Sequence, residues 1–370
     1  MTTGGWSWDA LARSMADSLQ LDVSSRVAIT TTGRGADEAV AAFVHEVYRR
    51  GGNAQVVLAD TRYDRYALAD AAHSVLGEPP PLQLAALSWS NVFVAFRPMA
   101  APDPGPSPDA GRLARQRQAL GQVSSARWRQ RQWSIVRVPT PAWADATGMS
   151  YDTLLAQFRS GSMLDWPRWR ARWAELATRL AGARQVRIQA PGTNLTLGVG
   201  GRCWVPFAGE HNLPDGELAT APVENSAEGT ITFPGPFWFA DTEFRGLSLR
   251  FAAGRVAEVT AEAGLEAARA ILSSDQGASR IGELGLGLNA RMTAWTGDLF
   301  FDEKILGTVH LALGRGYPEC GGVNESAVHW DIVLDLRPPA GGGSLLVDGR
   351  PLICGGIPQP PLTGERNDPW

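Results

Sequence analysis

The stretch RVAITTTGRGADEAVAAFVHEVYRRGGNAQVVLA, at residues 26–59, decides the fold of the first half of the chain. Val27 to Thr30 is a short run rich in β-branched residues, which favours a strand. Asp37 to Arg50 then places apolar residues at helical spacing and ends at a Gly-Gly pair. A second strand is expected at Gln55 to Ala59. A strand–helix–strand unit of this kind predicts an α/β domain with an open, mostly parallel sheet.

The same alternation continues along the first half, with a helix expected at Tyr66 to Leu76 and a strand at Asn91 to Phe96. A Pro-rich stretch at 101–109 predicts a surface loop. After about residue 185 the pattern changes to short strands separated by Gly and Pro, which favours a mainly antiparallel β (α+β) domain. The expected strands are 186–188, 195–199, 230–233, 247–251, 327–336 and 345–353, with a helix at 265–272. The sequence therefore predicts two domains, at residues 1–183 and 184–370.

Composition excludes several classes of function. The 370 residues are 44% hydrophobic and 19% charged, with a formal net charge of −4. This balance is typical of a globular protein and argues against a nucleic-acid partner. The arginine-rich run at 112–137 is interpreted as a solvated helix and connector. No apolar run is long enough to span a membrane, so no membrane-spanning segment is expected. Cys203, Cys320 and Cys354 form no C-x-x-C pair, which favours a reducing, cytoplasmic location.

The loop from Thr32 to Gly35 lies between the first strand and the first helix, where nucleotides often bind. However, the full G-x-G-x-x-G pattern is absent. No acidic residue is clearly placed to hold a ribose. Nucleotide binding is therefore the weaker interpretation of this loop.

Chemistry is suggested first by His329-Trp330-Asp331, which lies in a strand of alternating pattern. Residues i and i+2 of a strand project from the same face, so His329 and Asp331 point toward one spot. An imidazole beside a carboxylate suits Zn²⁺, Co²⁺, Mn²⁺ or Fe²⁺. The alternative is a His–Asp pair that is exposed, or buried and joined by a hydrogen bond.

Two further segments hold single polar residues in apolar, Gly-rich surroundings. His310 lies in the run 299–314 between Gly307 and Gly314, which allow close approach of the backbone. The alternative is a buried strand whose histidine bonds a backbone carbonyl. Glu283 is the lone acid of the run 281–289, and burying it without a partner would be costly.

A fourth segment begins at a Pro-Asp-Gly turn and carries acids on both sides. Either Glu217 or Glu224 is able to reach inward, whereas Asp215 and Glu228 are expected to face water. Two divalent ions held close together need about five or six protein ligands, including a bridging carboxylate. The residues that would fill such a site are Glu217, Glu283, His310, His329 and Asp331.

These segments together resemble the M29 metallopeptidases, the aminopeptidase T and aminopeptidase S group. The matching segments, which occur in the family's order, are NLPDGELATAP (212–222), GELGLGLN (282–289), LFFDEKILGTVHLALGRGY (299–317) and GGVNESAVHWD (321–331). The resemblance covers most of the chain. It is densest from 185 to 355.

The resemblance implies an aminopeptidase that hydrolyses an N-terminal peptide or related amide bond with a hydroxide generated at a dinuclear metal site. It places two divalent ions, zinc, cobalt or manganese, on the five ligands named above. Tyr317 matches an active-site tyrosine expected to steady the tetrahedral intermediate, and Glu303 matches a further acid near the metals. Glu283 is favoured as the general base. A homodimer acting on a small peptide or amide is also implied.

Two alternatives come from other classes of protein. A mononuclear non-haem iron dioxygenase that cleaves dihydroxypyridine rings resembles the same family, and His310, His329 and Asp331 would satisfy its iron site. Glu217 and Glu283 distinguish the aminopeptidase from the dioxygenase, because an iron triad does not need them. A metal-free binding or structural protein is the third hypothesis.

The segment between Tyr317 and His329 is shorter than in the best-known members of the M29 family, so the resemblance does not imply a substrate preference.

Overall fold

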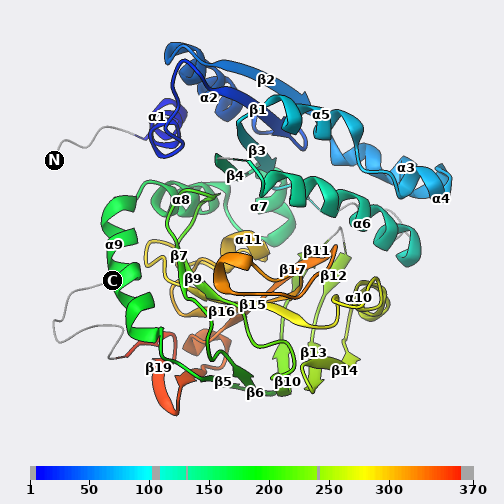
Figure 1. Cartoon of the computed structure of the whole chain (residues 1–370), viewed down its shortest axis with the longest axis vertical. Coiled ribbons are helices and arrows are strands. Elements are labelled where there is room, and N and C mark those ends of the chain that lie inside the picture. Colours follow the sequence, from blue (N-terminus) through cyan, green and yellow to red (C-terminus); the bar gives the residue numbers. More distant parts are fainter. Residues whose placement is uncertain (1–5, 102–108, 131, 240–241, 360–370) are drawn as a thin grey trace. The chain divides into compact units, whose positions relative to one another are not determined.

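The computed structural model describes residues 6–101, 109–130, 132–239 and 242–359 (Figure 1). They form two compact units, one of residues 1–165 with 209–215 and the other of residues 166–208 with 216–370. The expected loop at 101–109 lies almost wholly outside the described residues. Arg131 of the arginine-rich run also lies outside them. The domain boundary near residue 183 stays a prediction.

The first unit is built on a five-stranded sheet in the order β2-β1-β3-β4-β8, and every neighbouring pair is parallel. Its elements are α1 (Trp8–Ser18), β1 (Arg26–Thr31), α2 (Asp37–Arg49), β2 (Asn53–Leu58), η1 (Thr61–Tyr63), α3 (Asp64–Asp70), α4 (His73–Leu76), α5 (Pro81–Trp89), β3 (Val92–Pro98), α6 (Ala110–Arg127), β4 (Gln132–Val138), α7 (Pro141–Thr147), α8 (Tyr151–Ser162) and β8 (Asn212–Leu213). This confirms the predicted α/β unit with a mostly parallel sheet.

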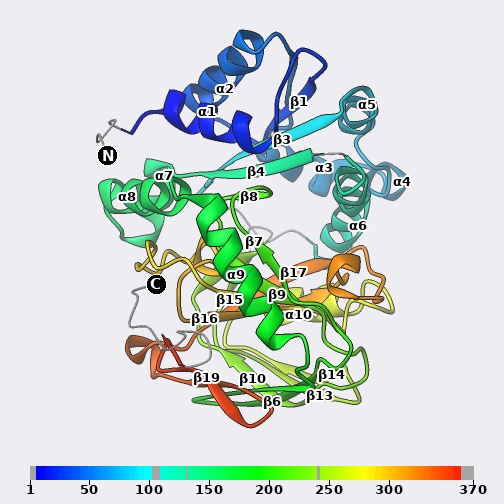
Figure 2. The ribbon, with the colours of Figure 1, turned by 60° about the vertical axis from the view of Figure 1, so that its left-hand side comes forward.

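The strand order places helices on both sides of this sheet. The connection from β1 to β2 runs one way along the sheet, and the connection from β2 to β3 runs back past β1. Right-handed crossovers therefore put α2 and α5 on opposite faces, as Figure 2 shows on either side of β1. The central strands β1 and β3 are almost wholly buried.

One expected helix is wrong in its extent. The segment Tyr66 to Leu76 forms two short helices, because Ala71 and Ala72 adopt extended backbone. Arg112 from α6 donates hydrogen bonds to the carbonyl oxygens of Ala67, Leu68 and Ala71, which satisfies the C-terminal carbonyls of α3. The arginine-rich run is accordingly not a freely solvated face.

The second unit contains two antiparallel sheets and a hairpin. The strand orders are β14-β13-β10-β6-β5-β18-β19-β20, β17-β16-β15-β9-β7 and β11-β12. Its elements are α9 (Trp166–Leu180), β5 (Gln185–Ala190), β6 (Thr193–Gly198), β7 (Val205–Phe207), β9 (Glu217–Thr220), β10 (Glu228–Phe233), β11 (Phe237–Phe239), β12 (Thr242–Phe244), β13 (Leu247–Ala252), β14 (Arg255–Thr260), α10 (Leu265–Leu272), β15 (Ile281–Gly287), α11 (Leu299–Asp302), β16 (Thr308–Gly314), η2 (Pro318–Cys320), β17 (His329–Asp335), η3 (Pro338–Ala340), β18 (Ser344–Val347), β19 (Arg350–Cys354) and β20 (Ile357–Pro358).

The core of this unit is rich in aromatic side chains. Trp330 of β17 is fully buried, and its ring lies 5.0 Å from that of Phe244. Phe244 in turn stacks on Phe237, with ring centroids 5.4 Å apart. Because Trp330 fills the core, the residues on either side of it along β17 project from the opposite face. The mainly antiparallel second half of the chain is thus confirmed. None of the helices in the described ranges is long and apolar enough to cross a membrane.

Candidate metal centre

The five predicted ligands lie on one sheet, β17-β16-β15-β9-β7. Glu283 of β15 is registered with Ala312 of β16, which is registered with Asp331 of β17. His310 lies two residues before Ala312 and therefore projects from the same face. Four strands of one sheet thus present their polar side chains on a single face, with Glu217 at the start of β9 and His329 at the start of β17.

Small residues make the floor of this face. His310 is registered with Gly285, and Gly285 with Ala219 of β9. A Cβ atom at Gly285 would lie 2.0 Å from Cε1 and 2.1 Å from Nε2 of His310. The imidazole therefore rests directly on the backbone of β15, in a place that only glycine allows.

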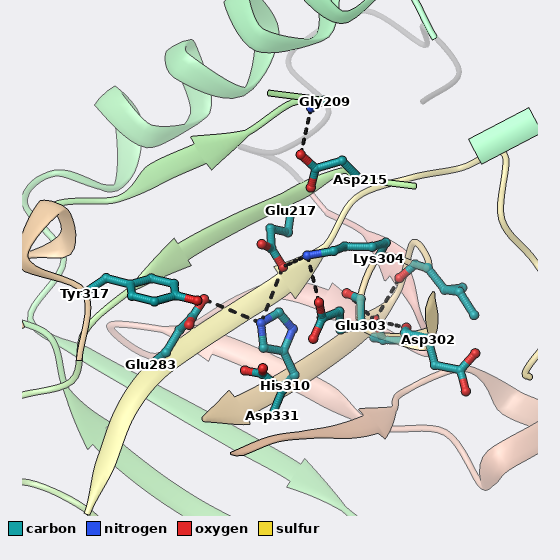
Figure 3. Close-up of polar contacts among 12 residues, drawn as sticks. Gly209, Asp215, Glu217, Glu283, Asp302, Glu303, Lys304, His310, Tyr317 and Asp331 are labelled. Atoms are coloured by element: carbon teal, nitrogen blue, oxygen red, sulfur yellow. Dashed lines mark hydrogen bonds and ion pairs between the residues drawn. The ribbon is translucent and has the colours of Figure 1, made fainter. Parts of the chain in front are cut away.

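The ligand atoms form two groups that share Glu283. Figure 3 labels four of the five ligands, Glu217, Glu283, His310 and Asp331, around one spot. In the first group, Nε2 of His310 lies 3.5 Å from Oε2 of Glu217 and 3.6 Å from Oε1 of Glu283. In the second group, Nε2 of His329 lies 3.3 Å from Oε2 of Glu283 and 3.3 Å from Oδ1 of Asp331. The two carboxylate oxygens of Glu283 thus face different imidazoles. A third set of potential ligand atoms comprises Glu303, His310 and Asp331.

His329 is held in place from its other side. Its Nδ1 lies 2.9 Å from the carbonyl oxygen of Arg315, which fixes the proton on Nδ1 and leaves Nε2 for the site. The Tyr317 ring stacks on the imidazole, with centroids 4.9 Å apart, and its hydroxyl lies 3.0 Å from Nε2. Tyr317 therefore aims its hydroxyl at the same spot as the predicted ligands.

Lys304, the only lysine of the chain, is fully buried beside the site. Its Nζ lies 2.7 Å from Oε2 of Glu217 and 2.8 Å from Oε1 of Glu303. The turn that carries Glu303 and Lys304 is fastened by Asp302, whose carboxylate accepts hydrogen bonds from Thr296 and from the backbone of Gly297. Lys304 thereby links a predicted ligand to a predicted catalytic acid.

The electrostatics of the face favour added positive charge. Burial alone would lower the pKa of His310, but the carboxylates of Glu283, Glu217 and Glu303 raise that pKa to about 9. The same balance, set by Asp331 and Glu283, raises the pKa of His329 to about 10. Carboxylates that hold protons on both imidazoles are also able to hold a divalent cation in their place.

The residues present fit such an ion. Oε2 of Glu283, which lies 3.3 Å from Nε2 of His329, is buried and forms no hydrogen bond with any described residue. Buried polar atoms are rarely left in this state, so each one calls for an explanation. Burial would raise the pKa of Glu283, yet the two imidazoles lower it and keep the carboxylate charged. Carboxylate oxygens with imidazole nitrogens are ligands that zinc, cobalt and manganese accept.

The structure brings together all seven residues predicted for the site, and it corrects two neighbouring expectations. Asp215, expected to face water, is buried and accepts a hydrogen bond from the backbone N–H of Gly209 at 2.7 Å. Glu224, which the sequence also allows to reach inward, instead forms an ion pair with Arg202 at 2.7 Å. Lys304 receives no role in the sequence analysis. Its uniqueness and its position next to Glu303 were the signals that could have assigned one.

Comparisons with known proteins bear on this site. The sequence profile of the family described as thermophilic metalloprotease (M29) matches residues 13–338. Aminopeptidase 2 of Geobacillus stearothermophilus is 30% identical over 275 residues, which cover 63% of this chain and 65% of the relative. Aminopeptidase T of Thermus thermophilus is 29% identical over 240 residues, which cover 55% of this chain and 59% of the relative. The matched parts therefore span less than two thirds of these relatives.

Solved structures share the fold. Wild-type AmpT from Thermus thermophilus aligns with a TM-score of 0.73 at 24% sequence identity, over 95% of this chain and 98% of that chain. A 2,5-dihydroxypyridine dioxygenase from Pseudomonas putida KT2440 aligns with a TM-score of 0.57 at 17% identity, over 96% of this chain and 97% of that chain. At these identities the likeness concerns the fold alone.

Proposed function

The chain belongs to the M29 family of metalloproteases, and from this membership we propose that it is a metal-dependent aminopeptidase that hydrolyses an N-terminal peptide or related amide bond. The observation that supports this most directly is the pair of ligand groups that share Glu283. A carboxylate with one oxygen toward each group is the bridging ligand that a dinuclear site requires.

In this proposal, Glu217, Glu283 and His310 would hold one divalent ion, and Glu283, His329 and Asp331 would hold the other. Zinc, cobalt or manganese would suit these ligands. When bound, they supply a hydroxide nucleophile at neutral pH and polarise the carbonyl oxygen of the substrate.

Side chains of the protein would stabilise the intermediate and transfer protons. Tyr317 would donate a hydrogen bond from its hydroxyl to the oxyanion of the tetrahedral intermediate, because burial and the nearby carboxylates raise its pKa well above the ordinary value and keep it protonated. Glu283 is the general base that the sequence favours, but a carboxylate with one oxygen toward each ligand group has no oxygen free to accept a proton, so we assign that role to Glu303. Glu303, held by Lys304 at 2.8 Å, is the second acid able to exchange a proton with the substrate.

The test is elemental analysis of chelator-stripped and metal-reconstituted protein, followed by a panel of aminoacyl amides. We expect about two divalent ions per chain and release of the N-terminal residue. Glu283→Gln is expected to keep the fold and lose hydrolysis, and His329→Ala to lose metal as well. Glu303→Gln separates the two acids, since it should keep both ions while slowing turnover.

The same measurement separates this proposal from its alternatives. One iron per chain, together with oxygen consumption on dihydroxylated aromatic rings, would favour a ring-cleaving dioxygenase that uses His310, His329 and Asp331. Reconstituted protein with neither activity would favour a metal-free binding or structural protein. Wild-type turnover in Glu283→Gln or His329→Ala would rule out the proposed site. Sedimentation in solution would test the homodimer, and cell fractionation the cytoplasmic location.

A further inference from the structure

The first unit carries a group of charged side chains that the metal chemistry does not use. Arg97 lies near the carboxyl end of β3, and its registered neighbour on β4 is Arg137. Registered residues of neighbouring strands project from the same face of a sheet, so the two side chains share one face. A guanidinium nitrogen of Arg137 donates a hydrogen bond to the carbonyl oxygen of Pro98 at 3.2 Å, which holds it beside Arg97.

Arg97 differs from the other partly buried arginines of this unit. It is half-buried, and within the described part of the chain its side chain forms no hydrogen bond, ion pair or ring contact. By contrast, Arg50 lies 2.7 Å from a carboxylate oxygen of Glu46, and Arg112 donates hydrogen bonds to the carbonyl oxygens of Leu68 and Ala67. A guanidinium withdrawn from water without a partner is costly, so its retention needs a reason.

The surroundings of Arg97 add positive charge. Burial, together with the guanidinium groups of Arg137 and of Arg117 from α6, lowers the pKa of Arg97 to about 10. Of the residues that the structure describes, no carboxylate contributes to that balance. Three guanidinium groups gathered in this way repel one another, and a bound anion would turn the repulsion into attraction. Planar guanidinium groups suit carboxylate and phosphate oxygens, which they bind through paired hydrogen bonds.

The position in the sheet is one where α/β proteins bind ligands. The strand order β2-β1-β3-β4 changes direction between β1 and β3, and ligands of open α/β sheets bind at the carboxyl ends of the strands at such a point. The loop after β1 reaches this edge, since a Cβ atom at Gly33 would lie 3.9 Å from Pro98, the residue after Arg97. Pro98 and Arg97 are consecutive residues of β3 and project from opposite faces, so this contact places the Gly33 to Gly35 segment at the edge of the sheet without placing it against the arginine side chains.

We propose that Arg97, Arg137 and Arg117 form a binding site for a small oxyanion, either a carboxylate or a phosphate group. The site belongs to the first unit alone. It does not depend on the proposed peptidase activity, so a negative result for one proposal does not affect the other.

The experiment compares wild-type full-length chain with Arg97→Gln. The matched control is Arg129→Gln, the same change at an exposed arginine of the same unit. Thermal unfolding is measured with inorganic phosphate and, separately, with succinate, at an ionic strength held constant with chloride. We expect saturating oxyanion to raise the wild-type Tm by roughly 2–4 °C or more. By calorimetry, the Kd of Arg97→Gln should be at least tenfold weaker, whereas Arg129→Gln should behave like wild type.

The results show whether the site exists, and they also distinguish a phosphate group from a carboxylate group as its ligand. A response to phosphate alone assigns a phosphate group, a response to succinate alone assigns a carboxylate, and both support a general oxyanion site. Without oxyanion, Arg97→Gln is expected to be at least as stable as wild type, because it removes an unpaired charge. A wild-type shift no larger than that of chloride, or an equal shift in Arg97→Gln, overturns the proposal. If Arg97→Gln does not fold, Arg97→Met replaces it, and the absence of saturable binding to wild type still refutes the site.

Discussion

Replacing Gly285 with alanine tests how the metal face is built. The added Cβ would lie 2.0 Å from Cε1 of His310, in a strand buried along its whole length. To reach an ordinary carbon contact of ~3.5 Å, the imidazole must move away by about 1.5 Å. Metal sites tolerate errors of only about 0.2 Å in their ligand distances. We therefore expect Gly285→Ala to lose the ion held by Glu217, Glu283 and His310.

The effects on metal, activity and stability are expected to differ in size. Metal content should fall from about two ions per chain to one or fewer. The kcat/KM on an aminoacyl amide should fall by about 100-fold or more, as expected for a misplacement of this size. Overpacking should reduce the free energy of unfolding by about 1–3 kcal/mol, measured by urea denaturation of chelator-stripped protein. The matched control is Gly182→Ala, since a Cβ at Gly182 meets no heavy atom within 4 Å.

The measurement that tests this reasoning is the metal content of the folded variant. If Gly285→Ala keeps both ions and wild-type turnover, His310 does not rest on β15 as a ligand, and the proposed site is wrong. If Gly285→Ala and Gly182→Ala lose metal equally, the loss reports a general effect of alanine rather than contact with His310.

Three further changes are expected to give measurable results. Tyr317→Phe keeps the ring stacked on His329 but removes the hydroxyl 3.0 Å from Nε2, so kcat should fall roughly 100- to 1000-fold with little change in KM, and unchanged kcat would contradict the role. Chelation should lower the free energy of unfolding by about 4 kcal/mol relative to protein at a thousandfold excess of metal over Kd, and calorimetric scans that coincide would argue against a metal centre. Hydrogen bonds from Arg49 and Arg50 lower the pKa of Glu46 from 4.5 to about 2. The stability from this charge is thus fully present above pH 4.5 and is lost as the pH falls toward 2. Glu46→Gln should be less stable than wild type by on the order of 2 kcal/mol at pH 7, allowing for the exposed Arg49, and this difference should shrink on acidification.

The local patterns predicted the elements that carry the site. Alternation around Trp330 was enough to place His329 and Asp331 on one face, because strand geometry has a strict period of two. The strand–helix–strand unit from 26 to 59 follows from its apolar spacing in the same way. Resemblance to a family then joined segments that lie up to about 100 residues apart. No local pattern shows that Gly285 supports His310, since strand register depends on the whole sheet.

Contacts set by tertiary structure were the ones that the sequence did not reveal. Asp215 follows a proline in a turn and looks solvent-exposed, yet it is buried and bonded to Gly209. The run of arginines at 112–137 is interpreted from the sequence as a solvated helix and connector. Arg112 instead bonds the carbonyl end of another helix. Backbone carbonyls carry no signal in the sequence, so partners of this kind are found only in the structure.

The arrangement of ligands makes the sheet and the metal centre depend on each other. Four strands contribute to the site, and a shift of one strand by a single residue would exchange its two faces. In β17 such a shift would bring Trp330 to the site and push His329 and Asp331 into the core, where neither would find a partner. Correct register therefore buries the aromatic side chain and assembles the ligands in the same step. Among the described residues, Lys304 offsets part of the negative charge that this assembly gathers, at Glu217 and Glu303. The two ions of the proposed site would balance the remaining charge, so their binding free energy would count directly toward the stability of this sheet.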